Sequence, residues 1–324
     1  MGDPAGVGPE IIIKAFQDKE LFSLSQGIVI GDAGFLESTA RQIEIPLTVH
    51  RISSPDQAQF HPGTLDVLDL KNVPGDLKRG RATAKGGKAS VEYILRAVKL
   101  ALDHQIDGIT TAPINKESIH KAGFCYPGHT ELLAEATNSK NVALMLAGKN
   151  LRVVLTTTHV PLHEVASQIT AERVLTTIRL THQWLKQHVA GDPKIAVTGL
   201  NPHCGDGGIF GKEETTAILP AMASARKQGI QVDGPHSADS LFIHNRHAAY
   251  DAVIAMYHDQ GMIPVKMDSA GTAVNITLGL PILRTSVDHG TAYDIAGTGS
   301  ASPESLKIAL KAAVAFSKPT AVTN

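Results

Sequence analysis

Short runs of β-branched and other apolar residues alternate along the chain with longer segments in which apolar positions recur at helical spacing. The short runs predict buried strands at residues 27–31, 109–111, 142–146, 153–157, 195–200 and 252–256. The longer segments predict helices at residues 8–16, 89–103, 171–187, 212–228 and 303–316. This alternation is typical of an α/β fold built on a largely parallel sheet.

The length of the chain favours two lobes rather than one. It has 324 residues, more than a single hydrophobic core usually serves. We therefore expect two α/β lobes with a cleft between them. Residues 78–88 are basic and rich in glycine, and this segment is predicted to be a loop.

The charge balance argues against nucleic acid and membrane surfaces as partners. Lysine and arginine number 30 and aspartate and glutamate 31, so the net charge is −1 and no overall field would gather polyanions. No apolar stretch approaches the roughly 18 to 20 residues that cross a bilayer, and the first residues do not resemble a signal peptide. We expect a cytoplasmic protein whose two cysteines, Cys125 and Cys204, are free thiols.

Three histidines follow predicted buried strands at equivalent places: His159, His203 and His258. The carboxyl ends of strands border the ligand crevice of an open α/β sheet, so three imidazoles there are able to converge on one divalent metal ion. Their spacing is not that of a local zinc motif. Each could instead be a capping or core histidine.

A second group of candidate residues is cationic and amide-bearing: Lys266, Asn275 and Arg284. A guanidinium binds two phosphate oxygens at once, an ammonium adds a point charge and an amide donates a neutral hydrogen bond. Together they suit a phosphate ester. On residue type alone they could equally be unrelated surface side chains.

The segment PGHTE, residues 127–131, is a tight turn that enters a predicted helix. Helix amino termini present free N–H groups and a positive dipole end, so His129 and Thr130 are candidates for binding a carboxylate or a phosphate. Thr130 could also be a simple N-cap. No G-x-G-x-x-G segment after a strand and no P-loop occurs, so a dinucleotide would have to bind in another way.

A family resemblance covers essentially the whole chain. The segments that carry it are GDPAGVGPE, TAPINKE, YPGHTELLA, TTTHVPL, GLNPHCGDGG, AMYHDQG, VNITLGLP and RTSVDHGTAYDIAG. They resemble the PdxA family of 4-hydroxythreonine-4-phosphate dehydrogenases. Position by position, the resemblance implies metal ligands at His159, His203 and His258. It implies substrate contacts at His129, Thr130, Lys266, Asn275 and Arg284.

The resemblance also implies a fold and a cofactor. The family is similar in fold to isocitrate and isopropylmalate dehydrogenases, which gives a first lobe of residues 1–128 and 281–324 and a second of residues 129–280. The segment HGTAYDIAG is similar to the loop with which those enzymes bind the adenosine half of NAD, which implies cofactor contacts by His289, Gly290, Thr291, Asp294 and Ile295. An acidic Asp294 would repel a 2′-phosphate and so favours NAD over NADP.

The function implied is the NAD-linked, metal-dependent oxidation of the secondary alcohol of a 4-phosphorylated 3-hydroxy acid, followed by loss of carbon dioxide. The first candidate is 4-hydroxythreonine-4-phosphate dehydrogenase of pyridoxal phosphate biosynthesis. The alternative is a dehydrogenase of 4-phospho-D-threonate or 4-phospho-D-erythronate that gives dihydroxyacetone phosphate. The related terephthalate dihydrodiol dehydrogenases depart at the PGHT segment, which is intact here, so an aromatic diol is disfavoured.

The proton-transfer group, the metal and the oligomer are further expectations. Lys116 is the candidate base, with Asp239 and Asp259 as alternatives that could instead orient ligands or be structural. The expected metal is zinc, with magnesium, cobalt and manganese as alternatives, and the family implies a homodimer with shared active sites. Two rivals, a metal-dependent phosphatase or aldolase and a non-catalytic metabolite-binding protein, would not need the HGTAYDIAG loop.

Overall fold

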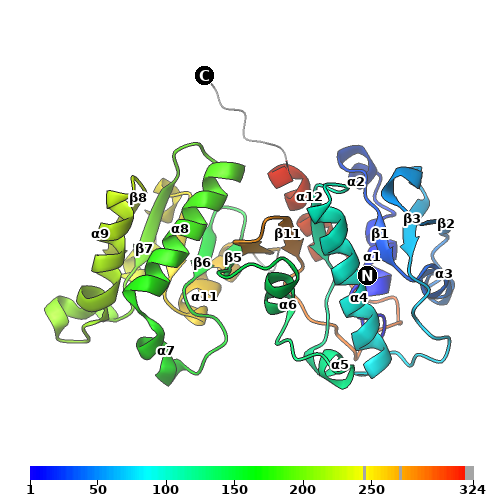
Figure 1. The fold of residues 1–324 in the computed structure, drawn as a ribbon, viewed down its shortest axis with the longest axis horizontal. Coiled ribbons are helices and arrows are strands. Elements are labelled where there is room, and N and C mark those ends of the chain that lie inside the picture. Colours follow the sequence, from blue (N-terminus) through cyan, green and yellow to red (C-terminus); the bar gives the residue numbers. More distant parts are fainter. Residues whose placement is uncertain (244–245, 270–271, 318–324) are drawn as a thin grey trace. The chain divides into compact units, whose positions relative to one another are not determined.

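The computed structural model describes residues 1–243, 246–269 and 272–317, and it divides the chain into two compact units (Figure 1). Unit 1 comprises Met1–Lys140 and Leu280–Ser317, and unit 2 comprises Asn141–Gly279. The sequence placed the first boundary before residue 129, whereas the structure keeps α6 (His129–Ala136) in unit 1 because Leu132 and Leu133 are buried in its core. Residues 318–324, which end the predicted first lobe, lie outside the described residues.

Unit 1 contains two sets of parallel strands. In the first set β3 (Thr64–Asp69) lies between β1 (Val29–Gly31) and β2 (Thr48–Ile52), and in the second β4 (Gly108–Thr111) pairs with β11 (Leu283–Ser286). The helices besides α6 are α1 (Gly8–Ala15), α2 (Lys19–Leu24), α3 (Ala33–Gln42), α4 (Ala84–Leu102), α5 (Lys116–Lys121) and α12 (Glu304–Ser317). Buried apolar side chains of α1, α3 and the first strand set form one core, and those of α4, α5 and α6 form another.

Helix α4 begins earlier than its sequence predicted. The prediction of a loop over residues 78–88 is wrong from Ala84 onward, because the Thr83 side chain accepts a hydrogen bond from Gly86 N at 3.0 Å and caps the helix. A Cβ atom on Gly87 would lie 1.9 Å from the carbonyl oxygen of Ser118. The glycines that lowered the helix signal therefore serve the close approach of α4 to α5.

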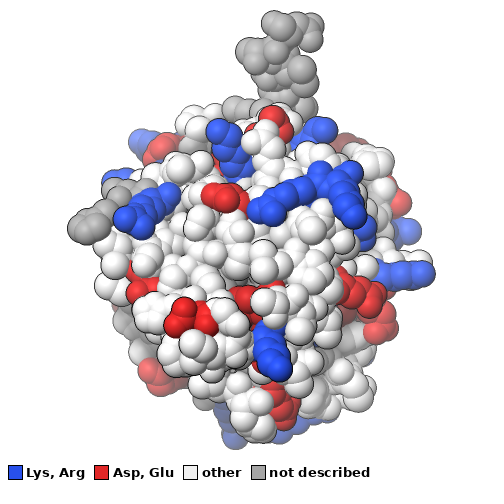
Figure 2. Space-filling view, turned by 90° about the vertical axis from the view of Figure 1, so that its left-hand side faces the viewer, with Lys and Arg blue, Asp and Glu red and all other residues white. Residues whose placement is uncertain are grey.

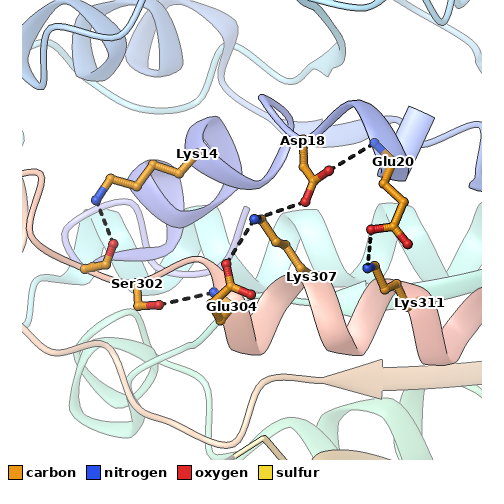
Figure 3. Close-up of polar contacts among 8 residues, drawn as sticks. Lys14, Asp18, Glu20, Ser302, Glu304, Lys307 and Lys311 are labelled. Atoms are coloured by element: carbon orange, nitrogen blue, oxygen red, sulfur yellow. Dashed lines mark hydrogen bonds and ion pairs between the residues drawn. The ribbon is translucent and has the colours of Figure 1, made fainter. Parts of the chain in front are cut away.

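Charged side chains join α12 to the first two helices (Figure 3). Lys307 Nζ lies 3.0 Å from an Asp18 carboxylate oxygen, and Lys311 Nζ lies 2.7 Å from Glu20 Oε2. The Lys14 ammonium donates to the carbonyl oxygen of Ala301 at 2.7 Å. Exposed ion pairs contribute only about 0–1 kcal/mol each, so their main effect is to select the position of α12 rather than to stabilise it strongly.

Unit 2 contains six neighbouring strands of a mixed sheet, together with helices. The strand order is β10 (Val274–Leu278), β5 (Ala143–Ala147), β6 (Arg152–Leu155), β9 (Ala252–Ala255), β7 (Lys194–Thr198) and β8 (Gln231–His236). Strand β5 is antiparallel to both of its neighbours, and the other pairs are parallel. The helical segments are α7 (Leu162–Gln168), α8 (Ala171–His188), η2 (Pro202–Gly208), η3 (Glu214–Ile218), α9 (Leu219–Lys227), α10 (Ala238–Leu241), η4 (Arg246–Ala249) and α11 (His258–Ser269).

The α/β fold class predicted from the sequence is thus confirmed, with a more mixed sheet than expected. Strands β6, β9 and β7 are adjacent and parallel, so their carboxyl ends lie at one edge of the sheet. None of the described helices is long and apolar enough to cross a membrane.

Candidate active site

The three candidate metal ligands follow the three adjacent parallel strands of unit 2. His159 comes after β6, His203 after β7, and His258 is the first residue of α11 after β9. Two hydrogen bonds hold the ends of β6 and β9 together, from Thr156 N to the Ala255 carbonyl at 2.9 Å and from Thr157 Oγ1 to the Met256 carbonyl at 2.8 Å. The topology therefore delivers all three histidines to the same edge of the sheet.

Two of these imidazoles lie together. The ring centroids of His159 and His258 are 5.6 Å apart with an interplanar angle of 43°, a separation compatible with both rings bonding one zinc ion at about 2.0–2.1 Å. His258 Nδ1 lies 2.6 Å from Asp259 Oδ1. A carboxylate on Nδ1 orients the ring and leaves Nε2 available for a metal.

His203 lies in a strained turn. Residues 203–207 all have positive φ, and three of them are not glycine: His203 at 52°, Cys204 at 55° and Asp206 at 43°. Left-handed backbone at non-glycine residues costs roughly 1–3 kcal/mol each, so the surroundings must hold this turn in place. The Ser237 hydroxyl donates a hydrogen bond to Asp239 and is the first cause that lowers the Asp239 pKa, and His203 adds a smaller electrostatic effect in the same direction.

The donor types of the candidate metal site suit a divalent ion, but the described residues do not bring three of them together. The donors suit a divalent ion, because imidazoles are common zinc ligands and an adjacent carboxylate orients one of them. Across residues 1–243, 246–269 and 272–317, however, no three histidine, cysteine or acidic side chains are grouped closely enough to hold a metal ion. His159 and His258 are brought together, and His203 is not brought into a ligand group with them.

Unit 1 contains a buried cationic side chain, Arg284. Arg284 is 2% exposed on β11 and donates from Nη2 to Thr111 Oγ1 at 2.8 Å. Burial lowers its pKa to about 9. His129 Nε2 is buried with no hydrogen-bond partner in the part of the chain that the structure describes. Burial, with the positive charge of Arg284 as the second cause, lowers the His129 pKa well below its usual value, so the two side chains interact electrostatically.

The structure decides two alternatives that the sequence left open. Thr130 is not an N-cap, since α6 begins at His129 after Gly128. Arg284 is a buried side chain and not a surface cation, whereas Lys266 is exposed on α11. Asn275 is half-buried on β10, and its Oδ1 is a buried acceptor with no partner among the described residues.

The predicted cofactor loop is anchored to the start of the chain. Thr291 is buried, and its carbonyl accepts a hydrogen bond from Val7 N at 2.9 Å. A Cβ on Gly6 would lie 2.8 Å from the Thr291 Cβ, so glycine permits this contact. Ile295 packs against the core of unit 1, while His289, Gly290 and Asp294 remain exposed. The loop thus has a fixed base and an accessible outer side.

Three residues that the sequence did not single out support this loop. The Tyr293 hydroxyl donates to Asp3 Oδ2 at 2.7 Å and lies 2.8 Å from Ser118 Oγ. Burial, with Asp3 as a further cause, raises the Tyr293 pKa. Ser118 is on α5, two residues after the exposed candidate base Lys116. Asp3 and Tyr293 belong to the quoted segments, but a sequence motif does not say which hydroxyl reaches which carboxylate.

The surface charge is mixed. On the face drawn in Figure 2, acidic and basic side chains are interspersed around a neutral area and form no single basic region. This agrees with the net charge of −1. Anion binding in this protein therefore rests on local groups such as Arg284.

The comparisons with known proteins show the family. A family model described as pyridoxal phosphate biosynthetic protein PdxA matches residues 23–313. The chain belongs to the PdxA family. It is 47% identical to the 4-hydroxythreonine-4-phosphate dehydrogenase of Geobacter metallireducens, over 96% of this chain and 92% of that one. It is 45% identical to the D-threonate 4-phosphate dehydrogenase of Cupriavidus necator, over 96% of this chain and 94% of that one.

A solved PdxA structure shares the fold over nearly the whole chain. The 4-hydroxythreonine-4-phosphate dehydrogenase of Klebsiella pneumoniae superposes with a TM-score of 0.92 at 41% identity, covering 98% of this chain and 96% of that one. The predicted family and the predicted enzyme class, a dehydrogenase, are confirmed. The metal, the nucleotide and the individual site residues are not tested by these comparisons.

Proposed function

We propose that this PdxA-family protein oxidises the C3 alcohol of a 4-phosphorylated 3-hydroxy acid with NAD and a divalent metal ion, and that the β-keto acid then loses carbon dioxide. The substrate proposed first is 4-hydroxythreonine 4-phosphate. The observation that carries the proposal is buried Arg284 in unit 1 together with half-buried His129, whose Nε2 atom is buried. A buried guanidinium beside an imidazole with an unsatisfied nitrogen suits a phosphate ester, which would hydrogen-bond both groups and favour the charged form of Arg284.

The chain's own residues have separate roles in this proposal. Arg284, His129 and Thr130 bind the phosphate end of the substrate, and Lys266 and Asn275 contact the rest of it. Lys116, exposed at the start of α5, is the proposed proton-transfer group, and it would accept the proton of the C3 hydroxyl in its neutral amine form. Asp239 and Asp259 act on the neighbouring histidines and not on the substrate.

Two groups from outside the chain complete the site. The divalent ion would be held by His159, His203 and His258. Zinc is the first candidate, with magnesium, cobalt or manganese as alternatives. Such an ion supplies Lewis acidity toward the alcohol and stabilises the enolate charge that develops during decarboxylation. The adenosine half of NAD would be bound by His289, Gly290, Thr291, Asp294 and Ile295. The nicotinamide half of the same cofactor accepts the hydride. The exposed carboxylate of Asp294 favours NAD over NADP.

A homodimer with shared active sites is also part of the proposal. Large apolar side chains are exposed on the segments that follow the three histidines: Leu162, Ile209, Phe210, Ile263 and Met267. Exposed apolar groups of this size favour a partner surface. A ligand supplied by a second copy would also explain why one chain does not group three metal ligands among its described residues. A cytoplasmic location, and no contact with nucleic acid or membrane, complete the expectation.

The choice of substrate is tested by direct comparison. The purified protein, NAD and zinc are mixed with 4-hydroxythreonine 4-phosphate, D-threonate 4-phosphate, D-erythronate 4-phosphate or the dephosphorylated form of each. We expect reduced nicotinamide with at least one phosphate ester and much less with its dephosphorylated form. D-Threonate 4-phosphate is the second candidate because the Cupriavidus necator relative is nearly as similar as the Geobacter one. Release of inorganic phosphate without nucleotide reduction would indicate a phosphatase instead.

A further inference from the structure

A buried carboxylate lies beneath the turn that carries His203. Glu214 is 2% exposed and begins η3, after the loop that follows β7. Its Oε1 accepts hydrogen bonds from the backbone N–H groups of Leu200 and Asn201, both at 2.8 Å, and its Oε2 accepts one from Asn201 Nδ2 at 3.0 Å. The carboxylate thus satisfies two backbone donors in the segment that leads from β7 into the turn.

The backbone on both sides of His203 is shaped around this carboxylate. A Cβ on Gly199 would lie 3.1 Å from Glu214 Oε1, and a Cβ on Gly205 would lie 2.8 Å from Glu214 Oε2. Gly205 also has a φ of +80°, so a side chain there would be both strained and obstructed. The chain therefore contacts Glu214 both before and after the metal-ligand candidate.

The other supports of the turn come from its own residues and from strand β8. Cys204 N donates to the Asn201 carbonyl at 3.1 Å, Phe210 N donates to the Gly205 carbonyl at 3.1 Å, and the Cys204 thiol donates to the Pro235 carbonyl at 3.4 Å. His203 is exposed, and its ring centroid lies 6.5 Å from that of Phe210. A run of left-handed residues needs a fixed anchor, and Glu214 is a buried group in contact with the chain before the turn and with Gly205 within it.

We propose that Glu214 is a positioning residue that holds the left-handed turn of residues 203–207 and thereby directs His203 toward the metal ion. This rests on the proposed function, in which His203 is a metal ligand. The neighbouring Glu213 offers a matched control. Glu213 is half-buried and accepts a side-chain hydrogen bond from Asn201 Nδ2 at 2.7 Å, but it does not contact the backbone N–H groups of Leu200 and Asn201 as Glu214 does.

The test measures zinc affinity in the metal-free, full-length protein by competition with a chromophoric chelator. Glu214→Gln keeps the size of the side chain but replaces one acceptor by an NH₂ group that faces a donor. We expect it to weaken zinc binding by about 10- to 100-fold, the usual effect of losing a group that orients a metal ligand. Glu213→Gln should stay close to wild type, and His203→Ala should weaken binding at least as much as Glu214→Gln.

A second readout separates positioning from general stabilisation. Hydrogen exchange at the Leu200 and Asn201 amides of the metal-free protein should be faster in Glu214→Gln and unchanged in Glu213→Gln. If Glu214→Gln is poorly folded, Asn201→Ala replaces it, because it removes one of the three donors and keeps the two backbone ones; a smaller loss of affinity is then expected.

The outcomes are distinguishable. If Glu214→Gln, or Asn201→Ala in its place, has wild-type zinc affinity and a lowered melting temperature, the role of Glu214 is merely structural. That result overturns this inference and leaves the proposed function standing. Wild-type zinc affinity in His203→Ala would overturn the assignment of His203 as a ligand, and the inference with it.

Discussion

The two regions that bind the proposed substrate and metal differ in how completely one chain builds them. In unit 1, Arg284 is inside the core and bonded to Thr111, and His129 lies beside it. In unit 2, His159 and His203 are exposed at strand ends, and one of the three histidines is not grouped with the others. The difference indicates that the proposed phosphate region is preorganised by folding, whereas the proposed metal region would need a further ligand beside His159 and His258.

This contrast has an energetic basis. Burial lowers the pKa of Arg284, and a bound phosphate would favour its charged form. The three candidate metal ligands of unit 2 are not buried, but the left-handed turn at His203 stores backbone strain. Substitutions in the two regions should therefore fail in different ways.

The largest expected effect belongs to His203→Ala. With two histidines left, the ion is held poorly, and turnover should fall by more than about 100-fold together with metal content, with little change in folding. The matched control is His163→Ala on α7, whose side chain is 81% exposed, and it should be active. Turnover and metal content are measured together, and full metal occupancy with normal turnover in His203→Ala would remove this residue from the metal site.

Arg284→Lys tests the phosphate region. It keeps a charge but loses the two-pronged contact with phosphate, and kcat/KM should fall by roughly 1–3 kcal/mol, with a larger loss for Arg284→Ala. Because the phosphate contact positions the reacting carbon, kcat should fall as well as KM rise. On the dephosphorylated substrate both variants should match wild type. Equal losses on both substrates would mean that Arg284 does not bind phosphate.

His129, half-buried with a buried Nε2 atom, predicts a pH dependence of stability in unit 1. Its pKa is lowered from 6.5 on folding, so below about pH 6.5 the unfolded chain takes up a proton that the folded one does not. Stability is complete above that pH and falls as pH drops toward the folded pKa, by at most about 1.4 kcal/mol per pH unit. Urea unfolding midpoints of His129→Gln should be less sensitive to acid over this range. An unchanged sensitivity would contradict the buried placement.

The smallest expected effect is that of Asp294→Lys. The side chain is exposed, so reversing its charge should change the preference for NAD over NADP by about 1–2 kcal/mol and leave stability nearly unchanged. Initial rates with each nucleotide give the ratio of kcat/KM values. If that ratio does not move, the adenosine half of the cofactor does not lie at Asp294.

Periodicity located the strands that deliver the site but not all of the sheet. The runs before His159, His203 and His258 are apolar and β-branched, so β6, β7 and β9 were predicted from them. Strand β8 was missed because Gln231–His236 contains a Gly-Pro pair, a signal for a turn and not for a strand. Strand β5 was predicted, but its antiparallel pairings depend on distant partners that no local pattern records.

The candidate site shows the same division between local and long-range information. Residue type and position at a strand end selected the histidines, and residue type selected Arg284, with which the family resemblance agreed. The burial of Arg284, the bond from Tyr293 to Asp3 and the bonds of Glu214 join residues far apart in the sequence or depend on packing. Glu214 in particular lay in a predicted helix, where a glutamate is ordinarily an exposed residue.

The most direct test of the proposed chemistry counts two products after metal is restored. Protein stripped of metal is mixed with NAD and the preferred 4-phosphorylated 3-hydroxy acid, and zinc is then added. We predict no reaction before zinc, and after it one reduced nicotinamide for each carbon dioxide released. Equal rates with and without metal, or reduction with no carbon dioxide, would contradict the proposed metal-dependent oxidation and decarboxylation.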